Sequence, residues 1–579
     1  MRMNREPVTI VKIAQPLCAL EFGVAPCTAS GTEDQKCVNT RATCLDLPNY
    51  DESVTLDLYF AEGHVADMGV PGAPYVFPAL VSVSTEPTQI NLGGTARDAQ
   101  GLGVRATTKI VIKDFQHSDR LTDPYREGRS WDTLDGERGS FWSRWTARNR
   151  YRQNIQITVY EGYAGQALDD MVTRTYFWQR ITREPGQVRI EGKDILSRIE
   201  ERKAQAPAAS PGILADDIDD AVTTFEVTGA TVDDYPAAGT LRINDEVMTY
   251  TGRAAVTGGV EFTGVTRGTD NTEADEHEAE DAVQLCLRFS AVPAWQVVRD
   301  LMVNYGEVDA SWLNLSQWQT LWRDYRGFFL LTHLVTAPTP VVDLIADVSE
   351  QCLVNFWWDE RQSLVNMSPL RGIEDQPQVI TDQRHIVAGS FTLREKIEER
   401  LTQVWVYFDT RNPVEDLDDE ANFARLQKRI NAVEEQAHGE ASIRKVFAYW
   451  LPTRSLAFAI SRTLLSLYLD NPSECEFTLD AKDRDLWVGD TMRISHHMDV
   501  DAFGLRRVRT WAIISARENH TDGTISYVAR DVTPLGVVNF IMASGEPDYS
   551  TSVVPPFKSC YIGDASGLLS DGTEAGKIA

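Results

Sequence analysis

The sequence lacks an apolar run long enough to cross a membrane. Its most hydrophobic stretch, GFFLLTHLVTAPTPVV from Gly327, is interrupted by His333, by three Thr and by two Pro, whereas a membrane-spanning helix needs about 20 apolar residues. The first residues, MRMNREPVTIVKIAQPLCAL, also lack the apolar core and the small-residue cleavage site of a signal peptide. We therefore expect no membrane span and no export by that route.

The sequence also lacks the familiar catalytic signatures. GxxxxGK[ST], GxSxG and HExxH are absent, and GLGVRA at Gly101 has no third glycine to complete a dinucleotide-binding fingerprint. We expect a protein that is not an enzyme. A pair of catalytic carboxylates among 85 Asp and Glu stays open, because such a pair has no sequence signature.

Positive charge is scarce. Lys and Arg number 56 against 85 Asp and Glu, which gives a net charge of −29, and such a chain repels nucleic acid phosphates. The exception is ERGSFWSRWTARNRYRQN, where five Arg alternate with aromatic residues. This pattern can stack bases, but Arg, Trp and Tyr also fill the cores of protein interfaces. We favour packing or an interface, and expect no stable nucleic acid binding.

The length of the chain predicts several domains. Its 579 residues exceed what one hydrophobic core accommodates. Short alternating runs such as NIQITVYEGY predict strands, and PAWQVVRDLMVNYG, PTPVVDLIADVSEQC and RSLAFAISRTLLSLYLDNP have helical spacing. The charged DEANFARLQKRINAVEEQ is expected to be a solvated helix or an arm. The predicted fold class is α+β, predominantly β, and multidomain.

The predicted parts follow changes in composition. Residues 208–285 hold 17 Asp and Glu against three Arg in runs that alternate around Gly turns, which favours a small inserted β module with a solvated acidic face. The six parts are a cysteine-rich segment (1–50), a β-rich domain (51–207), the acidic module (208–285), a helix-plus-strand domain (286–412), a helical arm with a C-terminal β domain (413–545) and a C-terminal extension (546–579).

Two weaker metal candidates are set aside. His496-His497 follows a predicted strand but has no third ligand nearby in the sequence, so exposed loop histidines are the simpler interpretation. Asp270, Asn271, Asp275 and Glu278 could chelate calcium, yet the glycine and ligand spacing of an EF-hand loop are missing.

Half of the eight cysteines lie within 27 residues. Cys18, Cys27, Cys37 and Cys44 form the pattern C-x8-C-x9-C-x6-C in a Gly- and Thr-rich stretch with weak periodicity. Four thiolates can hold zinc or an iron–sulphur cluster, and two disulfides are the third alternative. General spacing rules favour a metal over disulfides but do not choose between zinc and iron.

The motif resembles that of a known family. The pairs Cys18-x8-Cys27 and Cys37-x6-Cys44, with Phe22-Gly23 between the first two cysteines and a polar DQK before the third, resemble the iron–sulphur motif of lambda-type tail-tip proteins of long-tailed bacteriophages. LGVRATTKIVIKDFQHSD, DPYREG, GERGSFWSRWTARNRYRQN, ITVYEGY and VRIEGKDILSRIEERKAQAP are similar to the hub region of such proteins. The acidic module is similar to a β module that recurs in phage tail proteins.

The resemblance implies a structural virion protein assembled in the host cytoplasm. It would be a trimeric baseplate hub of β-barrel-like domains, in contact with distal tail-tube proteins and a central fibre protein. It would close the tail tube and open for the tape-measure protein and DNA during genome ejection. Cys18, Cys27, Cys37 and Cys44 would ligate a structural [4Fe-4S] cluster.

One departure and two alternatives accompany this resemblance. In the lambda-type family the cysteine motif lies towards the C-terminus, whereas here it opens the chain. The alternatives are a cell-wall-degrading tail enzyme, which would need a carboxylate pair or a zinc peptidase motif, and a tail protein with a zinc or disulfide clip.

Overall fold

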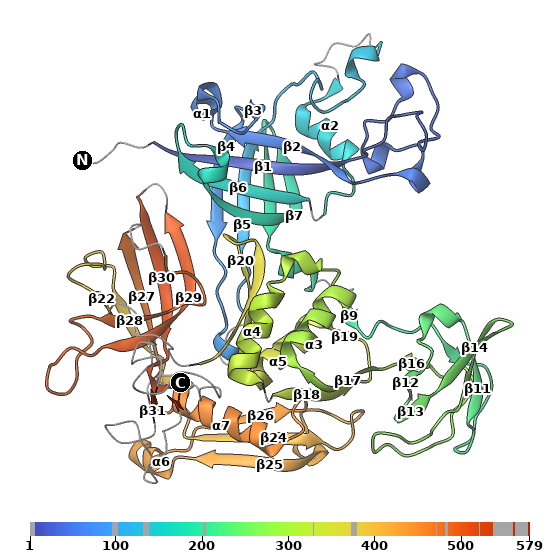
Figure 1. The fold of residues 1–579 in the computed structure, drawn as a ribbon, viewed down its shortest axis with the longest axis vertical. Coiled ribbons are helices and arrows are strands. Elements are labelled where there is room, and N and C mark those ends of the chain that lie inside the picture. The colour runs from blue at the N-terminus through green and yellow to red at the C-terminus, as the bar shows by residue number, and fades with distance from the viewer. Residues whose placement is uncertain are drawn as a thin grey trace.

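The computed structural model describes residues 6–94, 102–130, 138–153, 155–200, 204–327, 329–371, 379–470, 472–480, 485–519, 522–535, 560–561 and 577–578. Most of the predicted C-terminal extension therefore lies outside the described residues. The chain forms an α+β fold dominated by strands (Figure 1), which confirms the predicted fold class. Among the described residues, no helix is both long enough and apolar enough to span a bilayer.

An eight-stranded sheet of order β3-β2-β1-β6-β7-β8-β5-β4 forms the first part of the fold. Its strands are β1 Pro7–Leu17, β2 Val54–Ala61, β3 Val76–Phe77, β4 Leu80–Glu86, β5 Thr107–Lys113, β6 Gln156–Tyr163, β7 Val172–Glu184 and β8 Gln187–Lys193. The short helices α1 (Gly63–Met68) and α2 (Phe141–Arg148) accompany it. β1 pairs with β2 and β6, so residues before the cysteine motif belong to this sheet.

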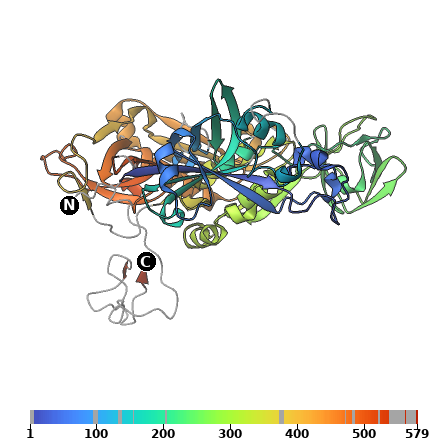
Figure 2. The ribbon, with the colours of Figure 1, turned by 90° about the horizontal axis from the view of Figure 1, so that it is seen from above.

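The acidic segment folds around a core of its own. β10 Ile213–Leu214, β11 Thr224–Thr228, β14 Gly252–Val256 and β15 Gly259–Thr263 form one sheet, and β12 Gly239–Ile243, β13 Glu246–Tyr250 and β16 Gln284–Leu285 form another. Their buried residues, including Tyr235, Leu241 and Phe262, form one cluster. Figures 1 and 2 both place this module at the end of the molecule opposite the C-terminal sheet.

The middle of the chain supplies the packing helices. α3 (Ala294–Asp300), α4 (Leu315–Arg326), α5 (Val341–Cys352) and α7 (Arg454–Tyr468) share the largest core with neighbouring strands. The helices predicted from apolar spacing are thus present. The associated strand pairs are β17 Leu287–Pro293 with β18 Leu330–Val335, β9 Gln205–Ala206 with β19 Thr339–Pro340, and β20 Val354–Asp359 with β21 Leu364–Pro369.

For residues 419–436 the sequence predicts a solvated helix or an arm, and the helix is wrong in the central part of this segment. Phe423–Ile430 is strand β25, which pairs with β24 (Gln403–Thr410), while β26 (Ile443–Ala448) pairs with the other side of β24. Phe423 and Gln427 are buried and the residues between them are exposed. Pairing with β24 and packing against α7 therefore outweigh the local helix propensity of this segment. A short helix, α6 (Ala432–His438), begins only after Asn431, whose side chain caps it.

The last sheet has six strands in the order β22-β28-β29-β30-β27-β23. They are β22 Val379–Thr381, β23 Thr392–Glu395, β27 Ser473–Asp480, β28 Thr491–Ser495, β29 Arg509–Asn519 and β30 Thr524–Asp531. The two-residue strands β31 Cys560–Tyr561 and β32 Lys577–Ile578 pair with each other. Seen from above, the molecule is flattened (Figure 2).

Candidate metal centre

The cysteine motif occupies the loop between two neighbouring antiparallel strands. Leu17 at the end of β1 pairs with Val54 at the start of β2, so the ends of the loop are held together. Inside it are three 3-10 turns, Glu33–Gln35, Arg41–Thr43 and Leu47–Asn49. Turns of this length do not order a long loop, so its conformation must come from contacts between segments.

The loop brings all four cysteines into one neighbourhood. Each of them is a free, partly buried thiol. Burial raises the pKa of Cys37 and of Cys44, and negative charge on Cys18 or Cys27 raises both further. Such interactions require the thiols to lie close together, so the structure gathers the four residues that the sequence singled out.

The four cysteine sulfurs are less closely spaced than the ligand atoms around one bound ion. Within the described part of the chain, which includes all four cysteines, no three of their sulfurs lie within 4.8 Å of one another. A zinc ion with four thiolates at about 2.3 Å in a tetrahedron would hold them about 3.8 Å apart. Binding of a zinc ion would therefore need the thiols to move closer together.

Two polar side chains connect the cysteines in pairs. The backbone of Cys18 donates to the Asn39 carbonyl oxygen at 2.6 Å, and the Cys37 thiol lies 3.5 Å from Asn39 Oδ1. Asn39 has φ 56°, a left-handed conformation that Asn tolerates well. Asp46 accepts from the Thr28 backbone N–H at 2.6 Å, next to Cys27, and its own N–H lies 3.4 Å from Cys44 Sγ.

A buried arginine from another loop fixes the same segment. Arg129 Nη1 and Nη2 donate to the carbonyl oxygens of Glu33, Asp34, Lys36 and Cys37 at 3.0–3.2 Å. Its guanidinium also binds Asp123 at 2.7 and 3.1 Å, and the two side chains are 2% and 0% exposed. Sequence reasoning missed Arg129 because it lies about 90 residues away from the cysteines. The one signal near it was DPYREG, the segment directly before it.

Tyr125 supports the other side of the loop. Its hydroxyl accepts from the Phe22 backbone N–H at 2.8 Å, and the Phe22 and Tyr125 rings pack edge to face with centroids 6.3 Å apart. Lys36 Nζ lies 4.9 Å from the Tyr125 ring centroid. The loop over residues 117–130 therefore packs against the cysteine-rich loop and supports it.

The basic and aromatic segment is mainly interior. Phe141, Trp142 and Trp145 are buried in the core of the first sheet. Arg138, Arg144 and Arg148 all pair with the carboxylate of Asp119. These contacts show interior packing for most of the segment, while Arg150 and Tyr151 at its end are exposed.

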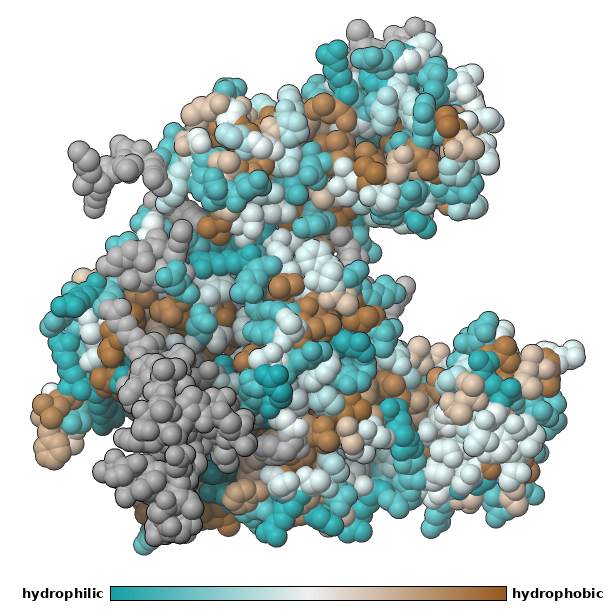
Figure 3. All heavy atoms as spheres, viewed as in Figure 1, coloured by the Kyte–Doolittle hydropathy of each residue, from teal (hydrophilic) through white to brown (hydrophobic). Residues whose placement is uncertain are grey.

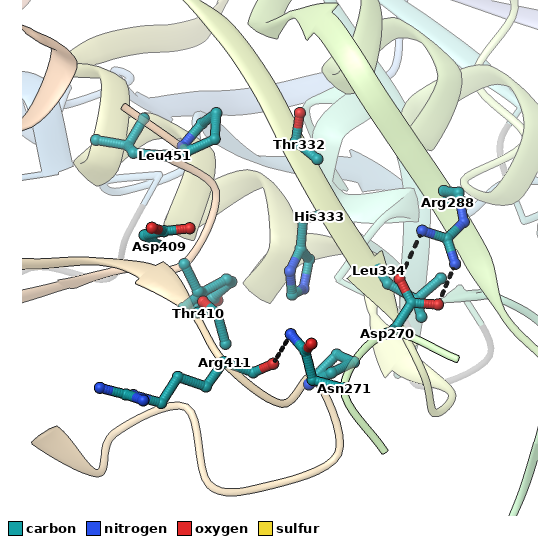
Figure 4. Close-up of a pocket in the computed structure, with 13 residues that line it drawn as sticks. Asp270, Asn271, Arg288, Thr332, His333, Leu334, Asp409, Thr410, Arg411 and Leu451 are labelled. Carbon is teal, nitrogen blue, oxygen red and sulfur yellow. Dashed lines mark hydrogen bonds and ion pairs between the residues drawn. The ribbon is translucent and has the colours of Figure 1, made fainter. Parts of the chain in front are cut away.

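Two of the four residues considered for calcium, Asp270 and Asn271, lie at the junction of the module with the body. Asp270 binds Arg288 at 2.9 and 2.5 Å, and Asn271 Nδ2 donates to the Arg411 carbonyl oxygen at 2.8 Å (Figure 4). They line a cavity of about 160 Å³ that also contains His333. Burial lowers the pKa of His333 to about 3, so this ring is neutral at pH 7.

The two adjacent histidines have a partner that the sequence did not reveal. His496 and His497 lie next to Asp382, and a ligand atom of each of the three residues lies within 4.8 Å of the others. The expectation that no third ligand is near these histidines is therefore wrong, because the third ligand is more than 100 residues away in the sequence.

Comparisons with known proteins give matches among solved structures alone: no family model and no curated protein matches the chain. A tail protein from Neisseria meningitidis MC58 is similar at 9% identity and TM-score 0.36, covering 79% of this chain and 94% of that one. The 43 kDa tail protein of prophage MuSo2 from Shewanella oneidensis has 8% identity, TM-score 0.34 and coverages of 79% and 98%. Prophage tail protein gp18 from Listeria monocytogenes EGD-e has 8% identity, TM-score 0.32 and coverages of 78% and 88%.

Proposed function

We propose that this chain is a structural, non-enzymatic hub protein of a bacteriophage-type tail, with an iron–sulphur cluster as a clip in its first domain. The observation that carries the proposal is the gathering of four free thiols in one loop. This loop contains the motif that resembles the lambda-type tail-tip family. The hub would close the tail tube and open for the tape-measure protein and DNA.

Cys18, Cys27, Cys37 and Cys44 would hold the cluster. When bound, it supplies four iron–sulfur links between points that lie far apart along the loop. Asn39 and Asp46 keep the cysteine-bearing segments paired, and the Asp46 N–H is oriented towards Cys44 Sγ. The choice of a cluster over a single zinc ion rests on the resemblance of the motif to that of the lambda-type family.

Exposed apolar side chains on the same loop support a contact with another protein. Val24 is 50% exposed, Leu45 61% and Leu47 56%, and neighbouring exposed apolar residues are typical of interaction sites. The partners that the family resemblance implies are two further copies of the chain, distal tail-tube proteins, the central fibre protein and the tape-measure protein. The place of action would be the virion tail tip.

Two experiments test this proposal. Protein purified without oxygen should be brown, with about four irons and four acid-labile sulfides per chain, and Cys286→Ser, which removes a thiol outside the loop, should keep them. Colourless protein with one zinc, or with disulfides among the four cysteines, would refute the cluster. Labelled antibodies on intact particles should locate the chain at the tail tip, and release of peptidoglycan fragments by the pure protein would favour the wall-degrading alternative.

A further inference from the structure

We propose that Asp382, His496 and His497 form a second metal site, which binds a divalent transition-metal ion of the zinc type. Two imidazoles and a carboxylate are ligands that zinc, nickel and copper accept and that magnesium does not prefer. One ligand atom from each of the three side chains lies within 4.8 Å of the other two. The site is separate from the cysteine-rich loop and does not depend on the proposed tail function.

Sheet topology explains how the three residues meet. β22 and β28 are parallel neighbours, and Thr381 pairs with Ser495 at their ends. Carboxyl ends of parallel strands lie at the same edge of a sheet. Asp382 follows β22 directly, and His496 and His497 follow β28, so the register of one strand pair places them together.

The two histidine rings are held in place. The His496 residue is 5% exposed, and its ring stacks on Phe391 with centroids 4.0 Å apart and an interplanar angle of 16°. The ring centroids of His496 and His497 are 4.3 Å apart. Ligation by His496 would end one weak contact, the 3.2 Å bond from the Met498 N–H to its Nδ1, in exchange for a metal–imidazole bond.

The carboxylate already has the orientation that a metal ligand needs. Asp382 Oδ1 accepts from Arg506 Nη1 at 2.8 Å, while Oδ2 lies 2.7 Å from His497 Nδ1. An ion would replace the hydrogen bond at Oδ2, and Arg506 would continue to hold Oδ1, as neighbouring hydrogen-bond donors orient ligating carboxylates in known metal sites. The positive charge of Arg506 also lowers the affinity for a cation, so we expect reversible binding rather than a permanent structural ion.

The position of the site suggests what the ion would stabilise. It lies at the base of the loop between β28 and β29, where Phe503 is 90% exposed and Leu505 66%. In Figure 3 this loop forms a brown patch at the lower left edge of the molecule. An ion bound by Asp382 and His497 would link the first residues of this apolar loop to the neighbouring strand end.

Residue-specific labelling can test the site even if the cysteines also bind zinc. We would treat the intact protein with diethyl pyrocarbonate, with and without zinc, and quantify each modified histidine by peptide mass spectrometry. Zinc should slow modification of the exposed His497 by about tenfold, magnesium should have no effect, and His438, outside the site, serves as the internal control.

Variants decide whether the protection comes from this site. Asp382→Asn should abolish protection of His497, whereas Asp522→Asn, a substitution in the β29–β30 turn, should leave it unchanged. His497→Gln provides a second test: it should bind one zinc ion fewer than the unaltered protein in equilibrium dialysis, with circular dichroism to establish that both variants are folded. Equal modification with and without zinc in the unaltered protein, or full protection in folded Asp382→Asn, would overturn the proposal.

Discussion

Replacing Arg129 by Ala should open the cysteine-rich loop while the first sheet stays folded. The substitution removes the donors to four backbone carbonyls of residues 33–37 and leaves the carboxylate of Asp123, which is 0% exposed, without its cation. The strands β1 and β2 pair independently of this contact. The damage should therefore be local.

The free-energy cost of Arg129→Ala follows from the burial of the Arg129–Asp123 ion pair. Removing one partner of a buried salt bridge costs about 3–5 kcal/mol, and the four carbonyl acceptors lose their donors in addition. Because about 1.4 kcal/mol corresponds to a factor of ten in an equilibrium constant, a cost of about 3 kcal/mol raises the open fraction of the loop about 100-fold.

Thiol alkylation measures this open fraction. In protein stripped of metal with a chelator, the rate at which iodoacetamide modifies Cys37 should rise about 100-fold in Arg129→Ala, because a partly buried thiol reacts mainly when its segment opens. Arg129→Lys should give an intermediate rate, since Lys keeps the charge but not the planar set of donors. The measurement needs no cluster, so it is independent of whether iron or zinc binds.

A control comes from the same loop. Arg126 is partly exposed and donates to the Ser118 carbonyl oxygen at 2.9 Å, so Arg126→Ala should change the Cys37 rate less than threefold. Buried Cys352 should react slowly in every variant. If Cys37 in Arg129→Ala reacts within a factor of three of the unaltered protein, Arg129 does not fix the loop and the reasoning fails.

Three further predictions concern the cluster and the acidic module. Cys37→Ser should lose the brown colour and most of the iron, and retention of about four irons would show that Cys37 is not a ligand. Deleting residues 208–285 should leave a soluble protein with the remaining far-ultraviolet dichroism, because the module has its own core; an insoluble product would show that it supports the body. Burial raises the pKa of Glu246, but bonds from Arg267 and His277 outweigh it and lower the pKa to about 2. The stabilisation is therefore complete above about pH 4.5 and lost as the pH falls towards 2. Unfolding of the module by acid should follow this range and should lose that dependence in Glu246→Gln.

Local patterns in the sequence predicted the local features of the fold. Apolar spacing located α3, α5 and α7 because each buries one face, for example Val298 and Leu301 in and after α3. The same reasoning failed for Phe423–Ile430, where few apolar residues reveal the strand and pairing with β24 determines its conformation. Site residues that lie within one short segment, such as the four cysteines, could be predicted from the sequence. Arg129 and Asp382 could not be predicted, because loop packing and strand register bring them to their sites from distant parts of the sequence.

The composition of the cysteine-rich loop explains why cross-links would add to the order that Arg129 provides. Ordering the backbone costs about 1–2 kcal/mol per residue, so residues 18–53 together require tens of kcal/mol. The loop buries few apolar side chains, among them Phe22 and Val38, and each supplies about 1.5–3 kcal/mol. Links at Cys18, Cys27, Cys37 and Cys44 would divide the loop into short segments of the length that ordinary turns span. Arg129 anchors the segment before Cys37, which is the longest interval between two cysteines of the motif. The hydrogen bonds of Arg129 and the links at the four thiols would thus both compensate for the small apolar area that the loop buries.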